Sequence, residues 1–233
     1  MNRIRPTLLV LTLLMVPAAS TEAKSRGLEA PDSARGVIGV SIRIVPPAKI
    51  GSSAAEVVYF VRVGKEEDLL GAEFVLKSNH HKGDRAYLLN AKPGRYVAVA
   101  CYYQPGGALG AGDYNTYFSA NLIKLSETEV RAGEVVFMGE MRVQSSTKMN
   151  EADSAQQHYW QLVSPENARK GGFARTMTGD YDYTGTADSI QRDAETERRF
   201  WTDAVGKDFK KEDAWLELVE KKLGQVPKPP TTP

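Results

Sequence analysis

One stretch of the sequence has the ligand spacing of a metal site. Its oxygen-bearing side chains recur at alternate positions, and the four candidate ligands are Asp180, Asp182, Thr184 and Asp188. Alternate oxygen ligands with a glycine at the sixth position are typical of the first part of a calcium-binding loop. The twelfth position of such a loop is a bidentate glutamate, and here it is Gln191. We therefore favour the alternative, a polar turn that leads into a helix capped by Asp188, and expect no cofactor.

Tyrosines gather on both sides of a glycine-rich segment, residues 104–113. They are Tyr102, Tyr103, Tyr114 and Tyr117. Exposed tyrosines beside a loop can recognise a peptide, a protein or a glycan, because their rings offer a large contact area and lose little entropy on binding. The alternative is that these tyrosines fill the core or cover a sheet face, as strand tyrosines often do.

The sequence contains no motif of a catalytic site. His80 and His81 are adjacent, so their side chains should point apart in a solvated loop, and no cysteine pair has zinc-binding spacing. The single cysteine, Cys101, lies in the apolar run VAVACYY and is expected to be a small buried residue. We therefore predict that the protein is not an enzyme.

The elements that would position these residues are mainly strands. The strands predicted from alternating and apolar runs are Val37–Val45, Glu56–Val63, Ala72–Ser78, Arg85–Ala91, a run from Arg95 to Tyr103, Tyr114–Leu125 and Glu134–Val143. Short strands at this spacing predict a mainly β fold, an antiparallel immunoglobulin-like or prealbumin-like sandwich of about seven strands. We place this β-sandwich domain at residues 37–146.

Three of these strands carry specific expectations. The run from Arg95 to Tyr103 is apolar on both faces, which predicts a central strand covered on each side. Val37–Val45 alternates, so the face with Gly39, Ser41 and Arg43 should be exposed. In the last strand, Val135, Phe137, Met141 and Val143 should share one face.

Two segments of this region resemble known sequences. KPGRYVAVACYY and, further on, VRAGEVVFMGEMRV are similar to strands of uncharacterised bacterial secreted and lipoprotein families with a prealbumin-like, or carboxypeptidase-regulatory-like, sandwich. The resemblance covers residues 37–145, and it lies in turn and core positions. It implies a fold and a non-catalytic module, and it offers no catalytic residues.

Helical spacing replaces the strands after about residue 150. We expect helices at Glu151–Val163, from Asp188 onward and at Glu212–Leu223, with a loop over residues 165–186. This helical extension, residues 150–224, contains Trp201 and Trp215. Residues 225–233 should form a disordered tail, and residues 24–36 a flexible lead-in.

The first residues have the pattern of a secretory signal peptide, which we place at residues 1–23. Arg3 and Arg5 precede an apolar run, Leu8–Val16, and small residues follow it. The run is too short to span a hydrocarbon core of about 30 Å. We predict a periplasmic or extracellular protein whose mature chain has no transmembrane span. Cleavage of the signal peptide leaves a chain with 28 basic and 28 acidic side chains. This balance lacks the basic surplus of a nucleic-acid binder.

These observations favour a non-catalytic secreted binding or interaction module of the bacterial envelope, with an unknown protein, peptide or glycan as its ligand. The alternative is a structural or accessory envelope protein that docks a partner through its C-terminal helices. The position of Trp201 and Trp215 separates these hypotheses. Tryptophans buried against the sheet would make the helices structural, whereas an exposed apolar stripe would make them a docking element.

Overall fold

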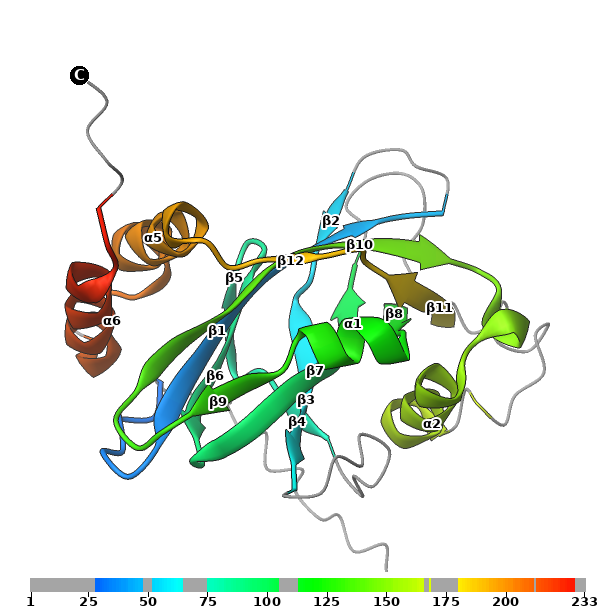
Figure 1. Cartoon of the computed structure of the whole chain (residues 1–233), viewed down its shortest axis with the longest axis horizontal. Helices are drawn as coiled ribbons and strands as arrows, with labels where there is room; N and C mark the ends of the chain where they lie inside the picture. Colours follow the sequence, from blue (N-terminus) through cyan, green and yellow to red (C-terminus); the bar gives the residue numbers. More distant parts are fainter. Residues whose placement is uncertain are drawn as a thin grey trace, which may run out of the picture.

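A single large sheet organises the protein. The computed structural model describes residues 28–47, 52–64, 75–104, 113–165, 168, 180–211 and 213–228. In these residues, twelve strands form one mixed sheet with the order β4-β3-β7-β8-β11-β10-β1-β6-β5, and β2, β9 and β12 pair beside β1, β7 and β10. Figure 1 shows α5 and α6 at one end of this sheet and α2 at the other.

Along the described chain, most of the strands come first and most of the helices follow them. The strands are β1 (Gly36–Val45), β2 (Ser53–Ala54), β3 (Val57–Val63), β4 (Leu76–Lys77), β5 (His80–Lys82), β6 (Arg85–Ala91), β7 (Gly94–Tyr103), β8 (Asp113–Phe118), β9 (Thr128–Val130), β10 (Val135–Ser146), β11 (Asp180–Thr186) and β12 (Ile190–Gln191). The helices are α1 (Ala120–Leu125), η1 (Met149–Glu151), α2 (Ser154–Val163), α5 (Ala194–Asp203), η2 (Ala204–Asp208, a π-helical turn) and α6 (Ala214–Gln225).

The prediction of a mainly β fold with C-terminal helices is confirmed, but a purely antiparallel sheet of seven strands is wrong. β1 pairs in parallel with β10, and β11 pairs in parallel with β8. β11 comes from the segment expected to be loop, and it lies between β8 and β10. The region expected to be a helical extension therefore completes the middle of the sheet, and the sheet does not end at residue 146.

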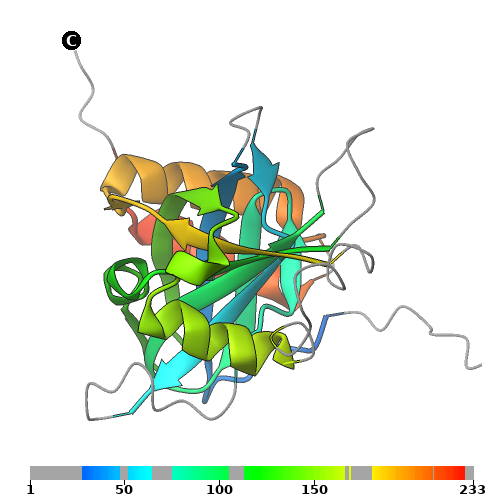
Figure 2. The ribbon, with the colours of Figure 1, turned by 90° about the vertical axis from the view of Figure 1, so that its right-hand side faces the viewer.

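β7 is the central strand that its sequence predicts. It pairs with β3 on one side and with β8 and β9 on the other, and Val97, Val99 and Cys101 are fully buried. The opposite face is covered as well, since Tyr96, Ala98 and Ala100 are at most 1% exposed. At the side of the strand, the hydroxyl of Ser126, the C-cap of α1, accepts a hydrogen bond from the backbone N–H of Ala98 at 2.8 Å. Figure 2 shows α2 packed across this side of the sheet.

β1 is buried on both faces, so the prediction of a half-exposed strand is wrong. Ser41 is only 4% exposed, and a side chain on Gly39 would meet Phe200 at 2.7 Å and Trp201 at 2.9 Å. The aromatic rings of α5 therefore occupy the face that should have been open to water. Arg43 alone in this strand is exposed.

A β-bulge explains a second error, in β10. The pairing with β1 shifts at Gly139, where φ is +125°. Val135 and Phe137 consequently face α5 and α6, whereas Met141 and Val143 face the main core. The four residues do not share one face, because an extra residue in a strand turns all later side chains over.

The tryptophans of the C-terminal helices are buried. Trp201 is 0% and Trp215 is 2% exposed, and both belong to an apolar cluster with Val37, Tyr87 and Leu89 of the sheet. This cluster fixes α5 and α6 to the outer face of β1, β6 and β10.

The helix boundaries are partly as predicted. α2 and α6 confirm two expected helices, and Asp153 caps α2 in a capping box with Gln156. The helix expected from Asp188 is wrong at its start, because Ile190–Gln191 forms β12 and Asp193 is the N-cap of α5.

The stretch predicted as a strand over Tyr114–Leu125 is divided. β8 ends at Phe118, and α1 then begins with Ser119 as its cap, because the Ser119 hydroxyl accepts from the Leu122 N–H. Residues 1–27, most of the glycine-rich segment and residues 229–233 lie outside the described residues. Within the described part of the chain, no helix is long and apolar enough to cross a membrane.

Candidate functional site

The proposed calcium ligands lie mostly on a strand rather than in a loop. Asp182 and Thr184 belong to β11, where they are 8% and 9% exposed, and Asp180 is the first residue of this strand. Asp188 is exposed at the bend that follows. The loop conformation expected for this segment is therefore wrong. Among the described residues, no group of three His, Cys, Asp or Glu side chains could hold a metal ion.

Asp182 instead joins a buried hydrogen-bonded cluster. The Tyr117 hydroxyl lies 2.9 Å from Asp182 Oδ1 and 2.8 Å from Ser164 Oγ at the end of α2. Burial, and next the negative charge of Asp182, raise the pKa of Tyr117 far above its ordinary value. Through these two hydrogen bonds Tyr117 connects α2 to β11. Because it is fully buried, it cannot contribute to an exposed binding surface.

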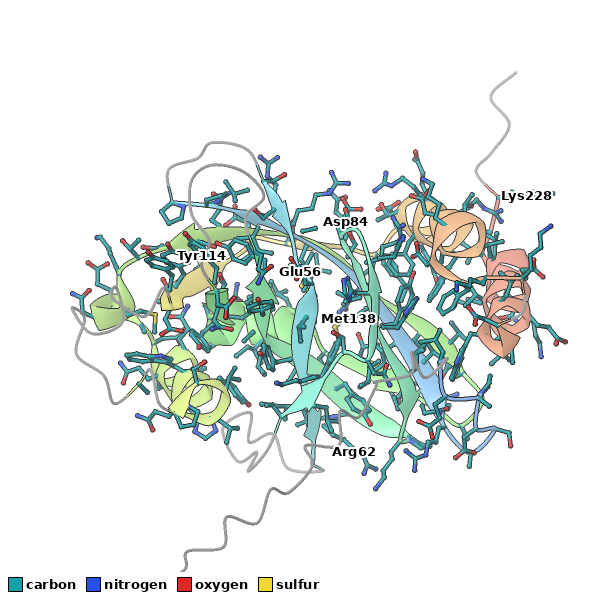
Figure 3. The ribbon with its side chains drawn as sticks, turned by 180° about the vertical axis from the view of Figure 1, so that it is seen from behind. Glu56, Arg62, Asp84, Tyr114, Met138 and Lys228 are labelled. Atoms are coloured by element: carbon teal, nitrogen blue, oxygen red, sulfur yellow. The ribbon has the colours of Figure 1, made fainter. Side chains whose placement is uncertain are left out.

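Tyrosines from three neighbouring strands stack in a row at the end of the sheet. Tyr103 pairs in register with Tyr114, and Tyr114 with Tyr181. The ring centroids are 5.4 Å apart in the first pair and 4.7 Å in the second, and Tyr183 lies 5.7 Å from Tyr114. Tyr103 is buried, whereas Tyr114, Tyr181 and Tyr183 are half-buried. Figure 3 places Tyr114 at the end of the sheet away from α5 and α6.

Tyr102 lies on the opposite face of β7, in a polar group at the same end of the sheet. Its hydroxyl donates to Asp113 Oδ1 at 2.7 Å, and Gln104 Nε2 donates to the Tyr102 hydroxyl at 2.7 Å. Burial, followed by the hydrogen bond to Asp113, raises the pKa of Tyr102 to about 12. Of the four predicted tyrosines, the structure therefore leaves Tyr102 and Tyr114 partly accessible, and it buries Tyr103 and Tyr117.

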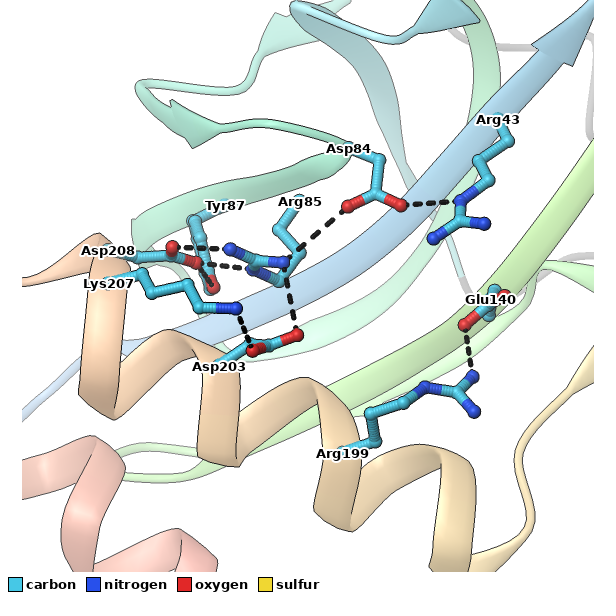
Figure 4. Close-up of polar contacts among 9 residues, drawn as sticks. All are labelled: Arg43, Asp84, Arg85, Tyr87, Glu140, Arg199, Asp203, Lys207 and Asp208. Atoms are coloured by element: carbon cyan, nitrogen blue, oxygen red, sulfur yellow. Dashed lines mark hydrogen bonds and ion pairs between the residues drawn. The ribbon is translucent and has the colours of Figure 1, made fainter. Parts of the chain in front are cut away.

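A charged network at the other end of the sheet was not predicted. Arg85 of β6 donates from Nε to Asp208 Oδ2 at 2.6 Å and from Nη2 to Asp208 Oδ1 at 2.7 Å. Tyr87 donates to the same carboxylate at 2.5 Å, and Asp84 and Asp203 lie 3.6 and 3.5 Å from Arg85 Nη1. Figure 4 shows how these groups connect the sheet to α5 and η2.

The centre of this network is buried. The Asp208 side chain is 0% exposed, and burial together with Asp208 raises the pKa of Tyr87 well above its ordinary value. His80 packs against Phe209, and its Nε2 lies 3.0 Å from the Asp208 carbonyl oxygen. The solvated loop expected for the histidine pair is thus wrong, because both residues belong to β5 and His81 alone is exposed.

A polar groove of about 430 Å³ lies on the outer face of the sheet beside this network. Its floor is formed by β1 and β10, and one wall is the connection from β11 to β12. Its polar lining includes Arg43, Glu140, Arg142, Asp188 and Gln191. Asp188 is conspicuous in the sequence for a different reason, as a candidate calcium ligand. The arginines are not conspicuous there, because only the strand register brings them together.

Cys101 is fully buried in the main core, as expected for a small packing residue. Burial raises the pKa of its thiol well above the ordinary value, which suppresses the reactive thiolate.

Comparison with known proteins identifies no relative of this chain. No family model, no curated protein and no solved structure matches it. The resemblance to prealbumin-like secreted families therefore stays a prediction, and the candidate sites must be judged from their own chemistry.

Proposed function

We propose that this protein is a non-catalytic binding module, exported to the bacterial envelope, that holds a saccharide against its row of stacked tyrosines. The observation that carries this proposal is the continuity of the row. It begins at the buried Tyr103 and continues through the half-buried Tyr114, Tyr181 and Tyr183. A ring anchored in this way loses little further entropy when a ligand packs on it.

The surroundings of the tyrosines suit a saccharide. The apolar face of a sugar ring packs on an aromatic ring, and its hydroxyls need hydrogen-bond partners at the edge of the contact. Asp113 and Gln104 are exposed at the same end of the sheet, where they lie with Tyr102 on its other face, and they offer acceptors and donors to a ligand that extends over the strand ends. The balanced charge of the chain after residue 23 gives no long-range attraction for a polyanion, so a neutral or weakly charged glycan is the better ligand class.

The alternative function, docking of a partner through the C-terminal helices, has less support. It requires an apolar stripe that the sheet leaves free. Trp201, Trp215 and Val219 are all buried in the cluster between the helices and the sheet, so these side chains already have their partners.

The binding proposal is tested by affinity electrophoresis of the purified protein through gels that contain soluble polysaccharides. We expect retardation by at least one of them, and we expect Tyr114→Ala and Tyr181→Ala each to weaken binding about fivefold, since an aromatic contact contributes on the order of 1 kcal/mol. His81→Ala, at an exposed position of β5, is the matched control and should bind normally. Retardation that survives both tyrosine variants would overturn the proposed site.

Export is tested separately by fractionating cells and sequencing the N-terminus of the protein in each fraction. We expect a mature form in the periplasm or medium that begins between about residues 18 and 24. A cytoplasmic protein that still begins at Met1 would contradict the envelope location.

A further inference from the structure

The outer face of the sheet is covered by helices at both ends and left open between them. Along β1, Gly39 lies under Phe200 and Trp201 of α5. Arg43 lies four residues further along the same strand, beyond the helix. α2 covers the sheet at its other end (Figure 1). The polar groove occupies this interval, so its floor belongs to the rigid sheet.

Two arginines lie side by side on this floor. Arg43 of β1 is paired in register with Arg142 of β10, on strands that run about 4.8 Å apart. Like charges in directly opposed positions are unfavourable unless something neutralises them. Among the described residues, Arg43 has one partner, Asp84, which its Nε contacts at 2.7 Å. Both terminal nitrogens of Arg43 are left available to a ligand.

Arg142 is the cation of this groove that has no partner among the described residues. Its side chain is exposed, and it makes no ion pair or side-chain hydrogen bond with any described residue. The nearby Glu140 is already engaged, because its carboxylate accepts from Arg199 Nη2 at 2.7 Å. An anion placed between Arg43 and Arg142 would therefore have to itself the terminal nitrogens of Arg43 and the whole guanidinium group of Arg142.

A carboxylate stands on the other side of Arg142. β10 pairs with β11 at Gln144 and Thr186 and with β12 at Met141 and Ile190, so the connection that contains Asp188 runs alongside Arg142. Asp188 is exposed and, within the described part of the chain, has no ion-pair partner. Across the groove the charges follow one another as Arg43 positive, Arg142 positive and Asp188 negative.

We propose that this groove binds a short peptide with free ends, its terminal carboxylate held by Arg43 and Arg142 and its terminal ammonium by Asp188. A guanidinium group binds a carboxylate through two parallel hydrogen bonds, which favours this orientation. An extended dipeptide is about 7 Å long, comparable with the one to two strand spacings between the arginine pair and the connection. The groove volume of about 430 Å³ lies within the usual range for small ligands.

The charged network keeps Arg43 in place. Asp84 joins Arg43 to Arg85, and Arg85 is fixed by the buried Asp208. Arg43 is therefore held in the groove before a ligand arrives, which lowers the entropic cost of binding. The site is independent of the tyrosine row, and neither proposal requires the other.

The test is calorimetric titration of the full chain with dialanine, N-acetyl-dialanine, dialanine amide and inorganic phosphate. We expect dialanine to bind, and blocking either end to weaken it at least tenfold. Arg142→Gln should reduce dialanine affinity at least tenfold, whereas Arg131→Gln, a matched change at an exposed arginine outside the groove, should not. Asp188→Asn should remove the preference for the free amine over the acetylated form.

Three results would overturn the proposal. They are no heat of binding with dialanine, unchanged affinity in Arg142→Gln, or phosphate binding as tightly as dialanine with no effect of Asp188→Asn. The last result would identify a simple anion site. Tyr114→Ala changes the tyrosine row and not the groove, so it should leave dialanine binding unchanged. The peptide proposal and the saccharide proposal can therefore fail independently of each other.

Discussion

Arg85 of β6 and Asp208 at the end of η2 form a bidentate ion pair, although 123 residues separate them in the sequence. The Asp208 side chain is fully buried and that of Arg85 is 12% exposed. Asp208 also accepts a hydrogen bond from Tyr87, so both of its oxygens are satisfied. The pair fixes the π-helical turn to the sheet, and through Asp84 it extends to the floor of the polar groove.

Asp208→Asn should strongly destabilise the protein. The substitution keeps the size of the side chain but leaves the Arg85 guanidinium without its principal countercharge in a buried position. Breaking one partner of a buried pair costs about 3–5 kcal/mol. Urea unfolding followed by circular dichroism measures the change. Lys207→Ala, which removes the exposed partner of Asp203, is the control and should cost less than about 1 kcal/mol. Equal losses in the two variants would show that the buried pair has no special role.

Asp193 rather than Asp188 should stabilise the start of α5. The Asp193 carboxylate accepts a hydrogen bond from the Thr196 N–H at 2.9 Å and a second one from the Thr196 hydroxyl. These two bonds lower the pKa of Asp193. Asp193→Ala should lower the melting temperature by roughly 2–4 °C near neutral pH. Asp188→Ala should leave it unchanged.

The effect of Asp193→Ala should depend on pH. Because folding lowers the pKa of Asp193, its stabilisation is present above the ordinary value of about 3.9 and is lost as the pH falls through the lowered value. Melts of wild type and variant should therefore converge in acid. A difference that persists in strong acid would mean that the carboxylate is not the stabilising group.

Calcium should not stabilise the protein through residues 180–188. Strand backbone does not wrap an ion as a calcium loop does, and β11 uses its hydrogen bonds to pair with β8 and β10. Thermal melts in chelator and in millimolar calcium should coincide. A rise in melting temperature that Asp180→Ala abolishes would instead establish a calcium site there.

Val99→Asp tests the central position of β7. Val99 is fully buried, and an aspartate there would place a charge without a partner in the core. We expect a loss of more than about 4 kcal/mol or failure to fold. Val99→Ala is the graded control, and it should fold with a loss of about 1–3 kcal/mol in denaturant unfolding. A mild effect of the aspartate would mean that water reaches this strand.

The sequence predicts the strands and helices that are determined by residues near one another in the chain. It does not predict the elements whose formation depends on contacts with distant segments. β7 was found because its two apolar faces are visible within ten residues, and α2 because its cap and its apolar spacing are local. β11 reads as loop, since DYDYTGT has few apolar residues. It becomes a strand because β8 and β10 offer hydrogen bonds on both sides.

The candidate sites follow the same division. The tyrosines beside the glycine-rich segment were visible in the sequence, but their burial was not, because it depends on Tyr181 and on α2. The arginine pair could not be predicted at all. Arg43 and Arg142 are 99 positions apart, and parallel pairing of β1 with β10 alone makes them neighbours.

Gly139 should be the least replaceable glycine of the described sheet. Its φ of +125° is unfavourable for any side chain, and a Cβ there would overlap Ile190 and approach Arg192 Cγ at 3.1 Å. We expect Gly139→Ala to cost about 2–5 kcal/mol from backbone strain and overpacking together. Gly224→Ala is the matched control, because Gly224 lies in α6 with nothing within 4 Å. It should be neutral or stabilise by up to about 1 kcal/mol.

A second variant separates the two causes. Gly139→Ala combined with Ile190→Ala removes the overlap and keeps the strained φ, so denaturant unfolding of the pair should recover part of the loss and not all of it. If Gly139→Ala alone is as stable as wild type, the bulge does not need a glycine. The division of β10 into one part facing α5 and another facing the main core would then have to arise from the pairing with β1.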